Sequence, residues 1–202
     1  MAEITAAAVK SLREKTGLPM MDCKKALQEA GGNEEKAIQV LRESNIKMKE
    51  TRLGRETSAG RIAVYSDLAK GVGAMIELQC ESAPVSNSPE FKQYVADLAK
   101  QLALGPGAKT PDDLLAQPSL SKPGMTLGAQ KDDMFNRIRE VFNLTRVLRI
   151  DAPTGAYAHH DGTSGVLVEV SGGTADVAKD VAMHIAAQKP ACLLYTSDAA
   201  DE

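Results

Sequence analysis

A run of apolar side chains, and the stretch that interrupts it, mark the middle of the chain. Residues 74–80 carry the apolar pattern of a mostly buried strand. Pro84 follows closely, and because proline lacks a backbone N–H and fixes its own φ, the strand should end before it. Residues 88–90, Ser-Pro-Glu, then predict a helix start, with a capping hydroxyl and proline at the first helical position. Residues 82–87 are therefore predicted to form a short, stiff loop, which either presents a rigid tip to a partner or is an ordinary tight connection.

Apolar side chains recur at helical spacing in three blocks of residues 4–45, which predicts three short helices. Gly17 and the glycine pair at residues 31–32 should end the first two helices. Pro19 and Asn33 should begin the second and the third. A bundle of this size buries little apolar surface, so it should be only marginally stable by itself.

The pattern changes at residue 60, after a polar segment of mixed charge at residues 47–59 that predicts a linker or a frayed helical extension. Residues 60–102 and 155–188 then repeat one order: strand, turn, strand, break, helix. Two halves of this design predict the α+β class, with antiparallel sheets backed by helices. The predicted strands are residues 60–65, 74–80, 144–150, 156–160 and 165–170, and the predicted turn of the first half is residues 66–73.

Two further helices are predicted in the second half of the chain. One covers residues 132–142, with Phe142 on its buried side. Asp161-Gly162 predicts a tight hairpin turn, because this pair tolerates positive φ. The last helix should be capped by Thr174. Its predicted stripe consists of Val177, Val181, His184 and Ile185.

Composition and charge exclude several classes of function. The chain has 202 residues, of which 43 % are hydrophobic and 25 % charged, as is usual for a globular protein. A net charge of -3 argues against binding along a nucleic-acid backbone, and 3 % aromatic residues give little surface for stacking bases. No apolar run is long enough to cross a bilayer, and the N-terminus lacks a signal-peptide pattern. Cys23, Cys80 and Cys192 show no metal or redox spacing, so we expect a cytoplasmic protein that binds no membrane.

No catalytic constellation is predicted. His159 and His160 stand beside Asp161 near a turn, and a redox or hydrolytic enzyme could pair His159 with Cys80, but nothing in the sequence orients such a base. Phosphate-loop and dinucleotide fingerprints are absent. We therefore expect no enzyme activity, no cofactor and no metal.

Two interpretations compete for residues 16–32, TGLPMMDCKKALQEAGG. Met20 and Met21 either belong to a helical core or form a docking surface next to Lys24 and Lys25. Consecutive residues point roughly 100° apart on a helix, so one methionine can be buried while the other stays near the surface. A nucleic-acid helix–turn–helix is disfavoured because the third predicted helix is acidic.

Residues 16–46, TGLPMMDCKKALQEAGGNEEKAIQVLRESNI, resemble the N-terminal domain of bacterial elongation factor Ts, whose members share the pattern TG-x-x-MMDCKKAL. The resemblance continues through IELQCES, GVLVEV and AMHIAAQKP and covers about residues 1–190. It implies a three-helix domain of the ubiquitin-associated type followed by two repeated α+β subdomains. The implied domains are residues 1–46, a linker at 47–59, a first subdomain at 60–143 and an incomplete second subdomain at 144–190.

The end of the chain, residues 191–202 (ACLLYTSDAADE), matches neither of the family's usual continuations. It is similar to a translated sequencing adapter, so we treat it as a non-native tail and leave it out of the fold prediction.

The resemblance also implies a function. Elongation factor Ts binds elongation factor Tu, both with GDP and without nucleotide, and promotes release of GDP by disturbing the Mg²⁺ site. In most of the family the wedge is an Asp-Phe pair within TDFV. Here the matching residues are Ser82, Ala83, Pro84 and Val85, so both the acid and the ring are missing. A proline-stiffened loop would then displace the partner by backbone position, helped by Val85.

Further contacts with elongation factor Tu are implied by the resemblance, together with a second copy of the chain bound through the C-terminal region that this chain lacks. For His159 (or His160), the competing interpretation is an ordinary surface residue of a turn. For His184, it is a partly buried helix residue. The main alternative function is a stand-alone adaptor that binds a peptide or a ubiquitin-like fold through the three-helix domain. The implied contact residues are Met20, Met21, Asp22, Lys24, Lys25, Tyr157, His159 (or His160), Met183 and His184.

Overall fold

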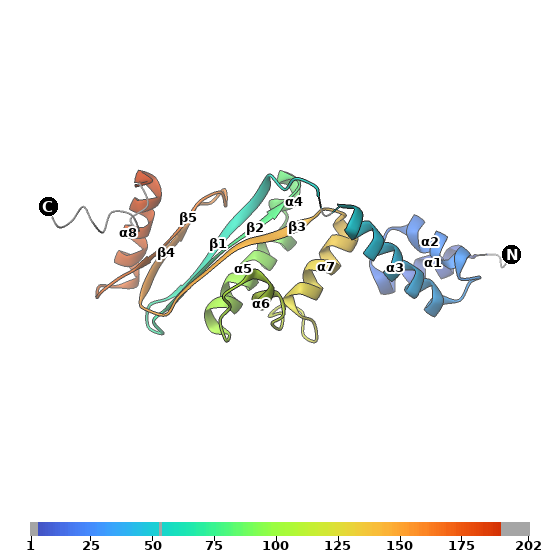
Figure 1. The fold of residues 1–202 in the computed structure, drawn as a ribbon, viewed down its shortest axis with the longest axis horizontal. Helices are drawn as coiled ribbons and strands as arrows, with labels where there is room; N and C mark the ends of the chain where they lie inside the picture. Colours follow the sequence, from blue (N-terminus) through green and yellow to red (C-terminus); the bar gives the residue numbers. More distant parts are fainter. Residues whose placement is uncertain (1–3, 53, 191–202) are drawn as a thin grey trace. The chain divides into compact units, whose positions relative to one another are not determined.

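The computed structural model describes residues 4–52 and 54–190, so the predicted non-native tail lies outside the described residues (Figure 1). The chain divides into two compact units. A helical unit contains the described residues up to Glu56 together with Gln130–Phe142. A mixed unit contains Thr57–Ala129 and the described residues from Asn143 onward. None of the described helices combines the length and the apolar character needed to cross a membrane.

Three helices form the core of the helical unit, and their ends follow the local chemistry of the sequence. Thr5 caps the first helix by accepting a hydrogen bond from the backbone N–H of Ala8 at 3.2 Å. Gly17 ends that helix with φ +68°, a left-handed conformation that suits glycine. Asn33 caps the third helix through the backbone N–H of Lys36 at 2.9 Å. The helices are α1 (Ala6–Thr16), α2 (Met20–Glu29) and α3 (Glu34–Arg52).

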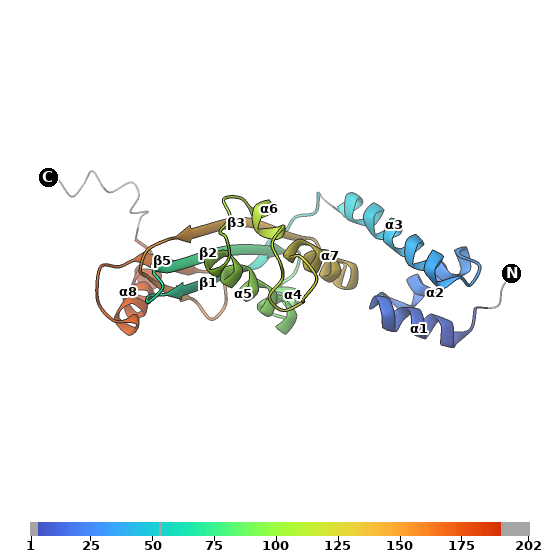
Figure 2. The ribbon, with the colours of Figure 1, turned by 90° about the horizontal axis from the view of Figure 1, so that it is seen from below.

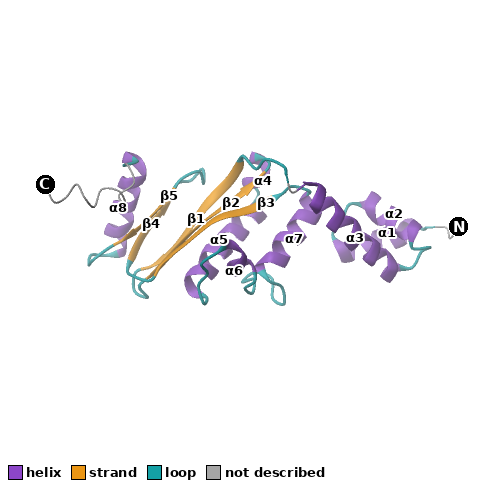
Figure 3. Cartoon of the chain, in the orientation of Figure 1, coloured by secondary structure: helices purple, strands orange, loops and turns teal. Residues whose placement is uncertain are grey.

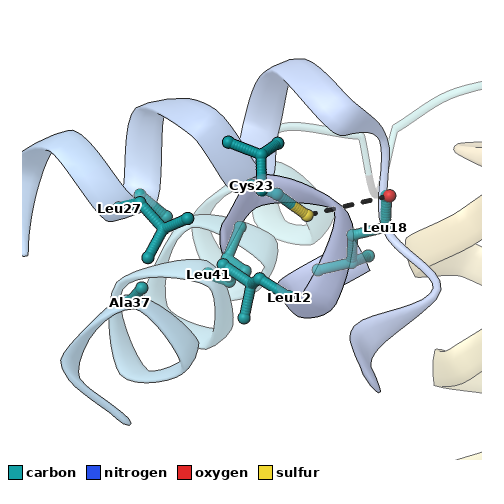
Figure 4. Packing of buried hydrophobic residues seen from close by; sticks show 8 residues of the cluster. Leu12, Leu18, Cys23, Leu27, Ala37 and Leu41 are labelled. Atoms are coloured by element: carbon teal, nitrogen blue, oxygen red, sulfur yellow. Dashed lines mark hydrogen bonds between the residues drawn. The ribbon is translucent and has the colours of Figure 1, made fainter. Parts of the chain in front are cut away.

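Side chains from all three helices, and from the α1–α2 connection, pack into one small apolar core (Figure 4). The thiol of Cys23 donates to the carbonyl of Leu18 at 3.8 Å within it. Because α3 continues to Arg52, the first part of the predicted linker is a helical extension. The buried members are Val9, Leu12, Leu18, Cys23, Ala26, Leu27, Ala37 and Leu41.

The helix predicted at residues 132–142 is displaced toward the N-terminus. Helix α7 covers Leu127–Ile138, and Phe142 begins a strand, so its placement on the helix was wrong. Arg139 follows the helix with φ +67°, and its N–H donates to the carbonyl of Phe135 at 2.7 Å. A residue in the left-handed region ends the helix there, and the chain turns into the strand.

A three-stranded sheet with the order β1-β2-β3 forms the centre of the mixed unit (Figure 3). Strands β1 and β2 are antiparallel, with Ala59 opposite Cys80 and Asp67 opposite Val72. The turn predicted at residues 66–73 is only the four residues 68–71, because both strands are longer than the apolar pattern indicates. Strand β3, predicted as the start of the second half, joins this first sheet. The strands are β1 (Ala59–Asp67), β2 (Val72–Cys80) and β3 (Phe142–Ile150).

The two faces of this sheet are covered by different elements (Figures 1 and 2). Helix α5 (Pro89–Leu104) packs on β1 and β2, and Ile76 and Leu78 are fully buried. The opposite face receives a hairpin of β4 (Thr154–Ala158) and β5 (Gly165–Glu169), which forms a second sheet. The remaining helices are α4 (Ala83–Ser86), α6 (Pro111–Leu115) and α8 (Ala175–Gln188), the last packed on the hairpin. The predicted α+β class is confirmed.

The apolar stripe predicted to be the buried side of the last helix lies largely on its exposed side. Thr174 caps α8 as expected, accepting from the backbone N–H of Val177 at 3.3 Å. Val177 and Val181, however, are 55 % and 43 % exposed, whereas Ala178 and Ala182 are buried. The helix lies so close to β4 that small residues fill its contact face, and the larger side chains remain outside.

Glu77 on β2 is expected to make the stability of the mixed unit depend on pH. Its carboxylate accepts from Arg146 Nε on β3 at 2.5 Å. Burial raises the pKa of Glu77, but hydrogen bonds from Arg146 and Gln79 outweigh burial and hold it below the usual value. A lowered pKa stabilises the fold above the ordinary Glu pKa, and this stabilisation disappears as the pH falls through the lowered value.

The corresponding variant is Glu77→Gln, measured by urea unfolding at pH 7 and at pH 3. We expect it to cost about 0.5–1 kcal/mol at pH 7, a modest value because Arg146 is largely exposed. At pH 3 the difference from the wild type should shrink. An equal cost at both pH values would rule out an ionic contribution of Glu77.

Candidate functional site

The predicted stiff loop after β2 is a single helical turn, so the interpretation of residues 82–87 as a loop was wrong. In α4, Ala83 and Pro84 are exposed, Val85 is half-buried and Ser86 is buried. The carbonyl of Ala83 accepts three hydrogen bonds: from the Ser86 hydroxyl at 2.9 Å, and from the backbone and side-chain amides of Asn87 at 3.1 and 3.0 Å. These bonds close the turn on itself. The predicted rigidity therefore has a structural basis, although its form is helical.

The chain leaves α4 directly into α5, which restrains the turn from the other side. The hydroxyl of Ser88 accepts from the backbone N–H of Phe91 at 3.3 Å, which is the helix cap predicted from Ser-Pro-Glu. The backbone N–H of Ser88 donates to the carbonyl of Val85 at 3.0 Å. Residues Ser82–Val85, which we call the α4 tip, thus present a small, mostly apolar, fixed surface that contains neither a carboxylate nor an aromatic ring.

The turn of the β4–β5 hairpin, residues 159–164, is the second feature. The N–H of His159 donates to the carbonyl of Ser164, and the N–H of Gly162 donates to the carbonyl of His159, at 2.9 and 2.8 Å. Asp161 accepts from the backbone N–H of Thr163 at 2.8 Å, a bond that holds the pKa of Asp161 below its usual value. Gly162 has φ +78°, as the Asp-Gly pair predicted.

Tyr157 and His159, both predicted as contact residues, lie together on this hairpin. The Tyr157 hydroxyl and His159 Nδ1 are 3.1 Å apart. The ring of the exposed His160 lies 4.3 Å from that of His159, centre to centre. The hydrogen bond between Tyr157 and His159 fixes the orientation of the His159 ring. His160 is an exposed residue of the turn, which agrees with the surface-turn interpretation.

Arg61 on β1 connects the α4 tip to the hairpin turn. Its Nη1 donates to Asn87 Oδ1, and its Nη2 donates to the carbonyl of His160, each at 2.9 Å. The neighbouring N–H of Ile62 donates to the carbonyl of Gly162 at 2.7 Å. One side chain therefore holds two segments that lie far apart in the sequence. The sequence carries no signal for Arg61, because its partners are 26 and 99 residues away.

In the helical unit, α2 presents both of its methionines on the surface. Met20 and Met21 are 50 % and 60 % exposed, so the interpretation that places them in the core was wrong. Leu18, just before the helix, contributes to the core instead. Lys24 and Lys25 are exposed beside them. The result is an apolar and basic patch of the kind that can adapt to a partner.

Asp22, also predicted to contact a partner, is engaged inside the helical unit. Its Oδ2 accepts from the guanidinium of Arg139 at 2.6 Å, and Arg139 also donates to Asn45 Oδ1 at 3.0 Å. This ion pair holds α2 and α3 to the residue that follows α7. Asp22 therefore has a structural partner within its own chain.

Met183 and His184 lie on the exposed side of α8, so the interpretation of His184 as partly buried was wrong. Met183 joins Val177 and Val181 as exposed apolar residues of this helix, among charged residues such as Asp176 and Asp180. Cys80 is fully buried and its thiol donates to the carbonyl of Ser82 at 3.3 Å. Within residues 4–52 and 54–190, no cluster of three or more His, Cys, Asp or Glu side chains could hold a metal ion.

Comparison with known proteins identifies the family. A sequence profile of the family described as Elongation factor TS matches residues 84–200, more than half of the chain. The chain belongs to this family. The match reaches ten residues into the end segment that we treated as a non-native tail. The matched region of this chain begins within α4 and includes the turn of the β4–β5 hairpin and α8.

Relatives in the elongation factor Ts family are similar along nearly the whole chain. Elongation factor Ts of Azoarcus sp. (strain BH72) is 41 % identical over 195 residues, which cover 96 % of this chain and 64 % of the relative. Elongation factor Ts of Methylococcus capsulatus is 38 % identical over 191 residues, covering 94 % and 64 %. Elongation factor Ts of Clostridium kluyveri is 36 % identical over 206 residues, covering 98 % and 66 %. The chain thus spans about 64 % of the length of the first two relatives.

Proposed function

We propose that this chain is a translation elongation factor that binds elongation factor Tu in its GDP-bound and nucleotide-free forms and promotes release of GDP in the cytoplasm. Membership of the elongation factor Ts family supports the partner. The observation that carries the proposal is the α4 tip, a fixed and exposed turn at the residues that the resemblance places at the family's wedge, Ser82–Val85.

Exchange requires no chemistry from the chain itself. A factor that binds the empty GTPase more tightly than the GDP-loaded one must, by linkage, weaken GDP binding by the same factor. Each tenfold weakening needs about 1.4 kcal/mol of contact energy that differs between the two states. Mg²⁺ is an effective target, because it bridges the nucleotide phosphates to oxygen ligands of the GTPase. A surface that shifts those ligands weakens Mg²⁺ and GDP together.

The α4 tip would produce this shift by position. Ala83 and Pro84 are exposed but too short to reach into a partner as an aromatic ring does. The turn is closed on the Ala83 carbonyl and joined to α5 through only two residues, Asn87 and Ser88, so it resists being pushed back. A rigid tip of this kind can displace a flexible segment of the partner through backbone contact.

Two other surfaces would supply binding energy without acting on the nucleotide. One is the α2 patch of Met20, Met21, Lys24 and Lys25, where adaptable thioethers lie next to positive charges. The other is the outer face of α8 with Met183 and His184. Contacts of equal strength in both nucleotide states would tighten the complex but leave GDP affinity unchanged.

The experiment measures the loss of fluorescent GDP from elongation factor Tu in excess unlabelled GDP, with and without the chain. We expect release to be roughly tenfold faster or more at saturating chain. If the tip acts through Mg²⁺, chelating Mg²⁺ beforehand should remove most of this acceleration. Binding without acceleration would instead support the adaptor function, and absence of both would reject the proposal.

A further inference from the structure

We infer that Arg61 is a positioning residue that holds the α4 tip and the hairpin turn together as one contact surface. The functional part of this inference rests on the proposed exchange activity, whereas its structural part does not. Arg61 lies on β1, between the two segments, and would contribute without touching the nucleotide site of the partner.

The fork geometry of the guanidinium makes the connection possible. Nη1 and Nη2 point to different segments, one to the Asn87 side chain that ends α4 and the other to the carbonyl of His160 in the turn. Lysine could not reproduce this, since its single ammonium group carries no planar pair of donors. The two bonds therefore form one rigid link between α4 and the turn.

The shape of the hairpin turn supplies independent support. A Cβ atom added to Gly162 would lie 2.6 Å from Cζ and Nε of Arg61, and Gly162 also has φ +78°. The backbone of the turn thus packs directly against the guanidinium, and the positive φ of Gly162 favours glycine at this position. The bond from the Ile62 N–H to the Gly162 carbonyl holds the turn at the edge of β1 in the same place.

Rigidity matters more in this chain than it would with a large side chain at the tip. Ala83 and Pro84 can act only through the position of the backbone, so any compliance of α4 reduces the displacement that reaches the partner. A surface that is already ordered also loses less conformational entropy on binding. Arg61 would supply this order by connecting α4 to the turn of the β4–β5 hairpin, which packs on the same sheet.

The structural test is hydrogen exchange of the free chain, which needs no partner. In Arg61→Met, the amides of residues 86–88 and of residues 159–162 should both exchange about threefold faster or more. Asn87→Leu removes the acceptor for Arg61 and should speed exchange in α4 but not in the turn, whereas Asn87→Asp keeps an acceptor and should leave α4 better protected than Asn87→Leu does. Both variants lose the bond from the Asn87 amide to the Ala83 carbonyl, so their difference isolates the contact with Arg61. Faster exchange in only one segment, or in neither, for Arg61→Met would overturn the inference.

The functional test uses GDP release at saturating chain. Arg61→Met should lower the maximal acceleration about fivefold with little change in the concentration that gives half of it, and Arg61→Lys should not restore it. An unchanged maximum, beside an active wild type, would overturn the positioning role. If the wild type itself fails to accelerate release, the proposed function falls, and hydrogen exchange alone decides whether Arg61 links the two segments.

Discussion

Replacing the four residues of α4, Ala83–Ser86, by four glycines should lower the acceleration of GDP release more than tenfold while leaving binding to elongation factor Tu measurable. Glycine removes the fixed φ of Pro84 and the Ser86 hydroxyl that closes the turn, and it makes a helical turn less favourable. If displacement depends on backbone position, a flexible tip loses about 1.4 kcal/mol or more of differential contact. The α2 patch and the α8 face remain intact and should maintain association.

The matched gain-of-function variant restores the family's pair at the tip, as Ala83→Asp with Pro84→Phe. Both positions are exposed, so the substitutions should fold without repacking the core. Adding a carboxylate and a ring at the contact should raise the acceleration several-fold above the wild type. The tip would be dismissed as the active element if the glycine variant and the double variant both released GDP at the wild-type rate.

Features set by neighbouring residues could be predicted from the sequence. The left-handed end at Gly17 and the caps at Asn33, Ser88 and Thr174 all depend on groups within a few residues, and each occurs where the sequence places it. The Asp-Gly turn of the hairpin belongs to the same class. Local hydrogen-bond chemistry is sufficient in these cases, because the partner is fixed by the chain itself.

Features that depend on distant partners could not be predicted. Arg139 ends α7 in a left-handed conformation while its guanidinium binds Asp22, 117 residues away. Arg61 similarly gains its role from Asn87 and His160. Nothing around either arginine in the sequence distinguishes it from a solvated surface residue.

Helical periodicity also indicated which residues share a face without indicating which face is buried. Val177 and Val181 do lie on one side of α8, but it is the exposed side. Met20 shares the stripe of Cys23 at the start of α2, where Leu18 already contributes to the core. In α8 the neighbouring hairpin decides the orientation, whereas in α2 Cys23, Ala26 and Leu27 are buried and, of this stripe, only Met20 at the start of the helix lies outside the core.

The close approach of α8 to the hairpin leads to the second large expected effect. A Cβ atom on Gly155 would lie 2.7 Å from the carbonyl carbon of Ala178, and nearer still to its oxygen. Because the obstacle is backbone rather than a flexible side chain, α8 must shift to accommodate Gly155→Ala. We expect a loss of about 2–3 kcal/mol in the urea unfolding free energy of the mixed unit, in the range of overpacked sites. Met183 and His184 would move with the helix, so affinity for elongation factor Tu should fall as well.

Two companion variants separate this explanation from general effects of adding a methyl group. Gly54→Ala, in the helical unit, adds the same group where nothing lies within 4 Å and φ is not in the left-handed region, so the unfolding free energy of each unit should match the wild type within about 0.5 kcal/mol. Ala178→Gly combined with Gly155→Ala should fail to restore stability, since removing the Ala178 side chain leaves its carbonyl in place. Full restoration by Ala178→Gly would show that the side chain, and not the helix backbone, limits how closely α8 approaches β4, and the outer face of α8 would then regain its position only in the double variant.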